Sequence, residues 1–178
     1  MLNWLNNYIS IETLIWLFPI TFLIHDFEEI IFVESWFKKY RKEILPRIPK
    51  NMKAAFQDLA STTSTRFAIP VFLQFILYIF AALIAVEQHI YEPLLGMNII
   101  LFLHVFMHIG QSLYFRVYAL GAGSALLVTL PYSVYLFYRL LHEGLAHTHD
   151  FFLSIPYGFL TIAAVLWGHR LARKILPA

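Results

Sequence analysis

The sequence predicts an all-α fold, a polytopic transmembrane helical bundle of about five spanning helices, with the N-terminus outside and the C-terminus cytoplasmic. The first observation is composition: 60% of the 178 residues are hydrophobic, 13% are charged, and the mean hydropathy is +0.66. Soluble domains carry about 25% charged residues. The second is a series of apolar stretches near the roughly 20 residues that a helix needs to cross a bilayer. The third is the grouping of Lys and Arg, which gives the orientation.

The first predicted span covers about 11–37. Pro19 is expected to kink it, and acids and a histidine interrupt its inner half. The stretch KKYRKEILPRIPKNMK follows and begins the basic cytoplasmic loop 38–66. Its charge and prolines predict a solvated loop or an interfacial helix that anchors the topology.

The remaining spans are separated by short polar turns. They are predicted at about 67–86, 94–115, 118–141 and 151–171, and the third of these contains Pro131. The whole chain, 1–178, is expected to be a single transmembrane domain, because no room is left for a soluble catalytic domain. We see no internal repeat of the kind that marks many secondary transporters.

Basic residues set the orientation, because Lys and Arg near span ends stay on the cytoplasmic side. With the N-terminus outside, every Lys and Arg except Arg139 falls inside. The expected location is the cytoplasmic membrane of a prokaryote, with membrane lipid as a partner and no nucleic acid. The N-terminal stretch MLNWLNNYIS lacks the Lys or Arg of a signal peptide, so it is expected to belong to the mature protein.

Two polar stripes interrupt the apolar spans. In the sequence HDFEE, His25, Glu28 and Glu29 cover roughly a 100° arc of the first helix. The third helix carries a second stripe within an arc of about 60°. Its members are His104, His108 and Gln111.

Depth brings the stripes together. Counted at about 1.5 Å per residue from the cytoplasmic ends, the first stripe lies about 9–15 Å deep and the second about 10–16 Å. Burying Asp26, Glu28 and Glu29 as anions costs roughly 8–10 kcal/mol on the insertion scale. Protonation, pairing with Arg116 or a bound divalent cation would offset that cost.

A metal accounts for both stripes, whereas protonation or Arg116 accounts only for the acids. The chain has no cysteine, and histidine with carboxylate suits zinc first, with iron or manganese as alternatives. Three ligands and an open position would lower the pKa of a bound water to about 7 and make a nucleophile. The predicted ligands are His25, Glu28, Glu29, His104 and His108, and the candidate catalytic residues are Glu28, Glu29 and Arg116.

Interpretations without a metal stay open. The stripes can form an ionisable network for proton handling or ligand binding, or polar contacts that hold helices together.

The other polar features have simpler interpretations. A solvated outer loop holds His142, His147 and His149; His169 is expected at the inner interface; and Gly121, Gly123, Ser124 and Ala125 form a small-residue patch expected to pack against the site helices.

Over most of its length the sequence resembles the family of membrane proteins named for the HXXEE motif, here the residues from His25 to Glu29. That family's NxxxH motif corresponds to HVFMH, with His104 in place of asparagine and His108 at the histidine. Its YxPG motif corresponds to YALG, from Tyr118 to Gly121, with leucine in place of proline. The first departure leaves position 104 able to hydrogen-bond or ligate, and the second is expected to change only a turn. The resemblance implies a fold and a site position, but no reaction.

The leading functional prediction is a metal-dependent intramembrane enzyme, a hydrolase or transferase acting on a lipid or other apolar substrate. The alternative is a proton or metal-cation transporter or channel that uses the same residues. A further alternative is a non-catalytic ligand-binding or assembly protein. The sequence predicts no oligomeric state.

Overall fold

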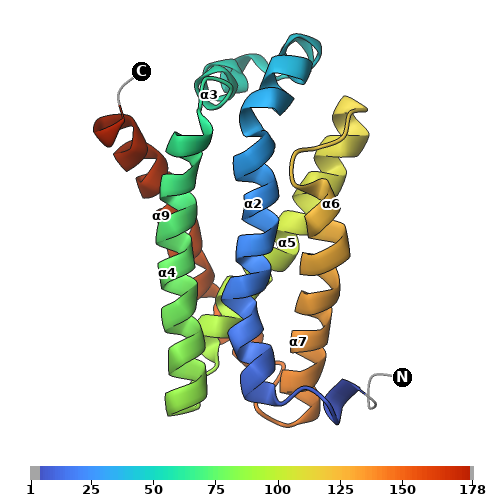
Figure 1. Cartoon of the computed structure of the whole chain (residues 1–178). Coiled ribbons are helices and arrows are strands. Elements are labelled where there is room, and N and C mark those ends of the chain that lie inside the picture. The colour runs from blue at the N-terminus through green and yellow to red at the C-terminus, as the bar shows by residue number, and fades with distance from the viewer. Residues whose placement is uncertain (1–4, 177–178) are drawn as a thin grey trace.

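The computed structural model describes residues 5–176, and within them the chain is helical with no strand. Figure 1 shows an elongated bundle in which the long helices run side by side. Its elements are α2 (Ile11–Ile44), α4 (Ser64–Gln88), α5 (Glu92–Phe115), α6 (Ala122–Ser124), the π-helical turn η3 (Ala125–Thr129), α7 (Leu130–His142), α8 (Asp150–Leu153) and α9 (Ile155–Ile175). The all-helical prediction is confirmed.

Local sequence explains where the helices begin and end. The side chains of Ser10 and Thr63 accept hydrogen bonds from the first-turn amides of α2 and α4, as N-caps do. The first turns of α5, α7 and α9 contain proline, which suits a position with no intrahelical amide bond. His89 and Arg116 end α4 and α5 in the left-handed conformation.

Helix α2 extends beyond the predicted span 11–37. It contains 34 residues, about 51 Å at 1.5 Å per residue, whereas the hydrocarbon core of a bilayer is about 30 Å thick. Pro19 lies inside the helix without ending it. The predicted basic loop 38–66 is therefore largely helical: after α2 come the 3₁₀ turns η1 (Leu45–Arg47) and η2 (Lys50–Met52) and the short helix α3 (Lys53–Leu59). We call this part of the molecule the basic end.

The predicted fourth span, 118–141, is a composite. Its first residues form a loop after α5, and the helical part begins at Ala122 and passes through η3 into α7. Pro131 is the second residue of α7, two residues after the end of η3, and has no amide hydrogen to donate to the preceding turn. A π-helical turn accommodates such an interruption of the α-helical hydrogen bonds.

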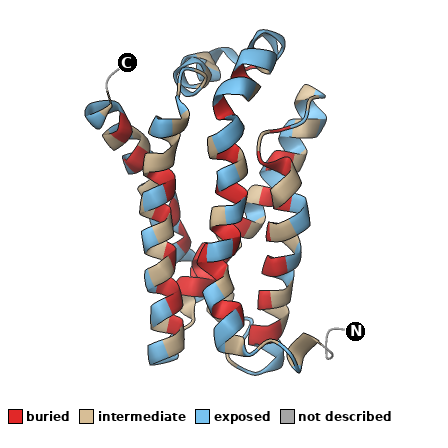
Figure 2. Cartoon of the chain, in the orientation of Figure 1, coloured by how far each residue is buried: buried red, intermediate tan, exposed pale blue. Residues whose placement is uncertain are grey.

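Small residues let the helices approach closely. A β-carbon added at Gly96 of α5 would lie 2.1 Å from the carbonyl oxygen of Ser154, and one at Gly168 of α9 would lie 2.5 Å from the α-carbon of Pro70. Close contact between backbones is a common basis of helix packing in membranes. The buried residues lie between the helices (Figure 2), where Phe18 of α2 stacks on Tyr78 of α4 with ring centroids 4.5 Å apart.

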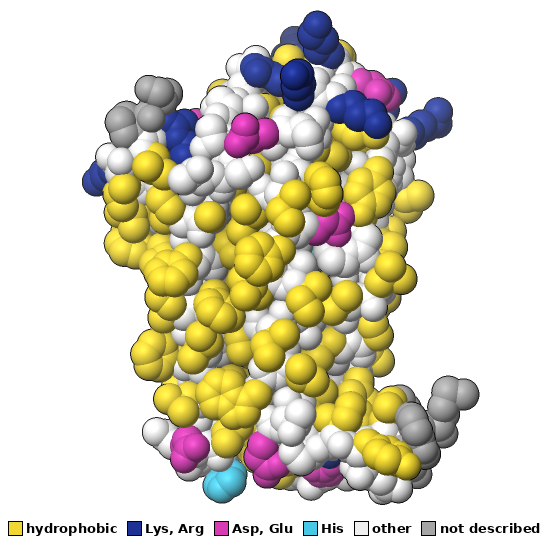
Figure 3. All heavy atoms as spheres, viewed as in Figure 1, with side chains coloured by type: hydrophobic (Ala, Val, Ile, Leu, Met, Phe, Trp, Pro, Cys, Tyr) yellow, Lys and Arg dark blue, Asp and Glu magenta, His cyan; other side chains and the backbone are white. Residues whose placement is uncertain are grey.

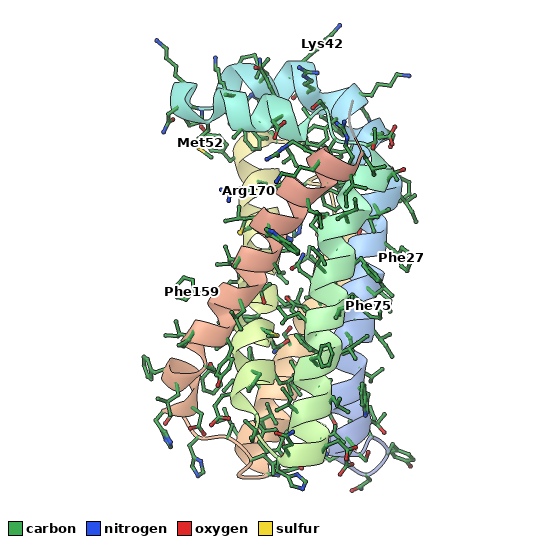
Figure 4. The ribbon with its side chains drawn as sticks, turned by 90° about the vertical axis from the view of Figure 1, so that its left-hand side faces the viewer. Phe27, Lys42, Met52, Phe75, Phe159 and Arg170 are labelled. Carbon is green, nitrogen blue, oxygen red and sulfur yellow. The ribbon has the colours of Figure 1, made fainter. Side chains whose placement is uncertain are left out.

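Among residues 5–176, four helical segments are long and apolar enough to cross a membrane: Ser64–Gln88, Glu92–Phe115, Ala122–His142 and Asp150–Ile175. Hydrophobic side chains cover the middle of the visible face, while Lys and Arg gather at the basic end (Figure 3). In Figure 4, Phe27 and Phe159 point away from the bundle, and Lys42 projects from the basic end. An apolar girdle with basic residues at one end is the surface of a membrane protein.

Candidate metal centre

Four side chains from two helices meet between α2 and α5. His25 and Glu29 lie one turn apart on α2, and His104 and His108 lie one turn apart on α5. Each offers one ligand atom, and these atoms all lie within 4.8 Å of one another. The structure thus places the two polar stripes at one level and in contact.

The spacing of these atoms suits a small cation. The Nε2 atom of His108 lies 2.9 Å from Nε2 of His104 and 3.3 Å from Oε1 of Glu29. His104 Nε2 is 3.9 Å from the same carboxylate oxygen. Ligand atoms bound tetrahedrally at about 2.0–2.1 Å are about 3.3 Å apart. The separation of His108 and Glu29 matches this value, and the other two differ from it by about 0.4 and 0.6 Å.

The cluster is closed on one side and open on the other. His25 and His108 are 1% and 3% exposed, whereas the side chain of His104 is 37% exposed. The Nε2 atom of His25 and the Nδ1 atom of His108 are buried and form no hydrogen bond of ordinary geometry with the described residues. Buried polar atoms are rarely left unpaired, so Nε2 of His25 is a candidate ligand atom, although the backbone of Gly121 also lies within interaction range of the ring.

The chain after α5 covers the cluster. Gly121 has a φ of +80°, and a β-carbon there would lie 2.6 Å from Oε1 of Glu29 and 2.9 Å from Cε1 of His25. Both its conformation and this close approach require glycine. The predicted packing of the small-residue patch on the site helices is seen here.

Glu28 lies outside the group of four, although the sequence analysis assigns it to the same site as Glu29. Its carboxylate accepts hydrogen bonds from the hydroxyl of Tyr118 at 2.5 Å, the hydroxyl of Ser124 at 2.5 Å and the amide of Ser124 at 2.8 Å. The hydroxyl of Tyr118 in turn accepts from the amide of Gly123 at 2.6 Å. Glu28 therefore holds the 118–124 segment against α2.

Three other predicted members of the stripes lie elsewhere. Asp26 is buried outside the group of four, within electrostatic range of both Tyr78 of α4 and Glu29. Gln111 and Arg116 are exposed near the end of α5. Within residues 5–176, Arg116 forms no ion pair with the acids of α2.

The remaining histidines do not join the cluster. His147 and His149 are exposed at the end opposite the basic end, where both approach Asp150, and His142 stacks on Tyr138. His169 contacts Phe67 with ring centroids 6.0 Å apart.

Two features of the site were not predicted from the sequence. One is Ser124, expected only to be a small packing residue, whose hydroxyl lies 3.1 Å from Nδ1 of His25. The other is Tyr118. Its place at the start of YALG, the segment that corresponds to the family's YxPG motif, was a sequence signal that could have marked it as a site residue. Asn98, with a buried side chain hydrogen-bonded to Ser133 at 3.0 Å, was also missed because a lone asparagine in an apolar span has no distinguishing pattern.

Comparison with known proteins identifies a family. Residues 16–136 match the family described as proteins of unknown function with an HXXEE motif. That range covers more than half of the chain and includes the four clustered residues and the 118–124 segment. No curated protein and no solved structure matches the chain. The predicted resemblance is confirmed: the chain belongs to the HXXEE family.

Proposed function

We propose that this protein is a membrane-embedded metalloprotein in which His25, Glu29, His104 and His108 bind a divalent cation, and that the metal serves a hydrolase or transferase reaction on a lipid or other apolar substrate. One observation carries the proposal: four ligand atoms lie within 4.8 Å of one another in the interior of an apolar bundle. Without a cation, this grouping would leave polar atoms without partners in an apolar interior, where an unpaired polar atom is most costly in free energy.

We further propose that α2 is a fifth span, with the N-terminus outside and the basic end in the cytoplasm of a prokaryotic cell. The exposed and buried positions of α2 support this. Its polar residues His25 and Glu29 are buried, whereas its apolar residues Ile24, Phe27 and Ile31 are about half exposed. A helix that turns its apolar side chains outward and its ionisable ones inward suits lipid as solvent.

Zinc is the proposed metal, with iron or manganese as alternatives, because three imidazoles and a carboxylate suit all three. Bound there, the metal would supply Lewis acidity and an activated water. The buried ligands would be His25, His108 and Glu29. His104 stands at the open side.

The open side favours an apolar substrate. Leu103 and Met107, the neighbours of His104 and His108 on α5, are more than half exposed. A substrate approaching His104 along this helix would cross apolar side chains. The proposed substrate class is therefore a lipid or another apolar molecule that enters from the membrane.

Elemental analysis tests the metal. The protein purified in detergent without chelators is expected to contain one equivalent of zinc, iron or manganese, and His108→Ala is expected to lose it. Asp26→Asn is the matched control, since this acid is buried on the same helix but outside the cluster. A wild-type protein that contains no stoichiometric zinc, iron or manganese would contradict the proposal.

Turnover tests the enzyme. Metal-loaded protein in nanodiscs of defined phospholipids is incubated, and the lipids are then examined by mass spectrometry for new hydrolysis or exchange products. Products that depend on His108 support an enzyme. A metal-loaded protein that changes none of the lipids tested argues against phospholipid as the substrate.

A cation transporter is the second candidate, and one observation favours it. Between the cluster and the end opposite the basic end, the buried polar atoms Nδ2 of Asn98 and Oγ1 of Thr129 have no hydrogen-bond partner among the described residues. Such atoms can line a polar path. Zinc flux into proteoliposomes that is lost in Asn98→Leu would favour transport, and flux equal to that of protein-free liposomes would oppose it.

A further inference from the structure

We propose that Ser124 and Glu28 are positioning residues that hold His25 as the tautomer protonated on Nδ1, and so keep its Nε2 atom free to bind the metal. The inference deepens the proposed metal site and depends on it for its function, although the tautomer itself is a property of the metal-free protein. Neither residue is proposed as a ligand.

The first step concerns the proton of the Ser124 hydroxyl. Its oxygen lies 2.5 Å from Oε2 of Glu28, and two oxygens so close need a proton between them. The competing acceptors are the carbonyl oxygens of Gly121 at 3.3 Å and His25 at 3.5 Å. A carboxylate at 2.5 Å is the stronger acceptor, so the hydroxyl donates to Glu28.

The second step concerns the hydrogen bonds that Glu28 accepts. Besides the Ser124 hydroxyl it accepts from the Ser124 amide and from Tyr118. The hydroxyl of Tyr118 already accepts from the amide of Gly123, which leaves its own proton for Glu28. Three donors therefore point at this one carboxyl group, which acts as the acceptor in each of these contacts.

The third step concerns His25. Because the Ser124 hydroxyl donates its one proton to Glu28, it can only accept from Nδ1 of His25, which lies 3.1 Å away. The neutral ring then carries its proton on Nδ1 and its lone pair on Nε2. This Nε2 atom is the buried nitrogen left unpaired at the cluster.

These contacts form a relay from Glu28 through Ser124 to His25. Ligating histidines commonly donate their second ring nitrogen to a carboxylate or carbonyl group, and loss of such a partner typically costs about 10- to 100-fold in metal affinity or activity. Here a serine hydroxyl stands between the carboxylate and the imidazole. Ser124 is the last residue of α6, and α6 lies beside α2 (Figure 1).

Nitrogen NMR of ¹⁵N-histidine-labelled, metal-free protein in nanodiscs tests the tautomer. The His25 signals are identified by their loss in His25→Gln. We expect protonated Nδ1 and unprotonated Nε2 in the wild type. In Glu28→Gln the amide can donate to the serine oxygen, so Ser124 donates to His25 and the tautomer is expected to reverse. A wild-type His25 protonated on Nε2, or a tautomer unchanged in Glu28→Gln, would overturn the proposal.

Metal affinity, measured by competition with a chromogenic zinc chelator, tests the consequence. Ser124→Ala and Glu28→Gln are expected to weaken zinc binding by about 10- to 100-fold, with Glu28→Gln the weaker binder. The control is Ser133→Ala, a buried serine bonded to Asn98 away from the cluster, which is expected to bind as the wild type does. Thermal unfolding lowered in both site variants, with tautomer and affinity unchanged, would reduce the pair to a structural tether and overturn the proposal. Wild-type protein that binds no zinc would instead defeat the proposed function, and the NMR result would still decide the tautomer.

Discussion

Gly121 lies so close to Glu29 that a β-carbon at position 121 would meet the carboxylate oxygen Oε1 at 2.6 Å. The loop that follows α5 therefore restricts the position of the Glu29 carboxylate.

Gly121→Ala is expected to displace Glu29 and His25 and to reduce zinc affinity as well as stability. The physical causes are a steric overlap with both side chains and a φ of +80°. The control is Gly144→Ala, which has a similar φ of +71° with nothing within 4 Å of the added carbon. Chelator competition and thermal unfolding measure both effects. Equal zinc affinity in the two variants would contradict the close approach.

Glu29→Gln is expected to weaken zinc binding by more than the roughly 10- to 100-fold of an outer-shell loss, because it removes an anionic ligand. Asp26→Asn is expected to retain zinc far better than Glu29→Gln, since Asp26 is not one of the four clustered residues. Isothermal titration with zinc in detergent compares the two. If Asp26→Asn loses zinc and Glu29→Gln retains it, Asp26 and not Glu29 is the carboxylate ligand.

His104→Ala is expected to retain more zinc than His108→Ala, because His104 lies at the open side while His108 is buried. A centre with three inner ligands keeps a position for water or substrate, as catalytic zinc sites do. Zinc content after dialysis measures the difference. Equal and complete loss in both variants would indicate a closed, four-ligand structural site.

Gly96→Ala is expected to lower stability by about 1–3 kcal/mol through overpacking, since its added carbon would meet the carbonyl oxygen of Ser154 at 2.1 Å. Gly110→Ala on the same helix meets nothing within 4 Å and is expected not to destabilise. Thermal unfolding in detergent ranks the two. A Gly96→Ala protein as stable as wild type would count against the close α5–α9 crossing.

Single cysteines test whether α2 is a span. The chain has no native cysteine, so Asn7→Cys and Lys42→Cys can be labelled in cells with a membrane-impermeant maleimide. Asn7→Cys is expected to react in intact cells, and Lys42→Cys only after permeabilisation. Both sites reacting from the same side would mean that α2 does not cross the membrane.

The pairing of the polar stripes was accessible from sequence because helical geometry is regular. A rise of about 1.5 Å and a turn of about 100° per residue place His25 and Glu29 on one face, and His104 and His108 on another, at a matching depth. The same calculation placed Glu28 beside Glu29 and could not tell which of the two carboxylates joins the cluster. Adjacent residues share a broad face, and only the position of the 118–124 segment separates a clustered carboxylate from one held by Tyr118 and Ser124.

The sequence alone determined the all-helical class, the apolar segments, the family and the two histidine-bearing stripes, because composition and helical periodicity are local properties. The tertiary structure decided which side chains meet: Glu29 and not Glu28 at the cluster, Gly121 against it, and Ser124 behind His25. The reason is that Gly121 and Ser124 lie more than ninety positions along the chain from the α2 residues that they contact, Glu29 and His25. Their contacts depend on a left-handed glycine, a three-residue helix and a π-helical turn. None of these features has a periodic sequence pattern from which it could be predicted.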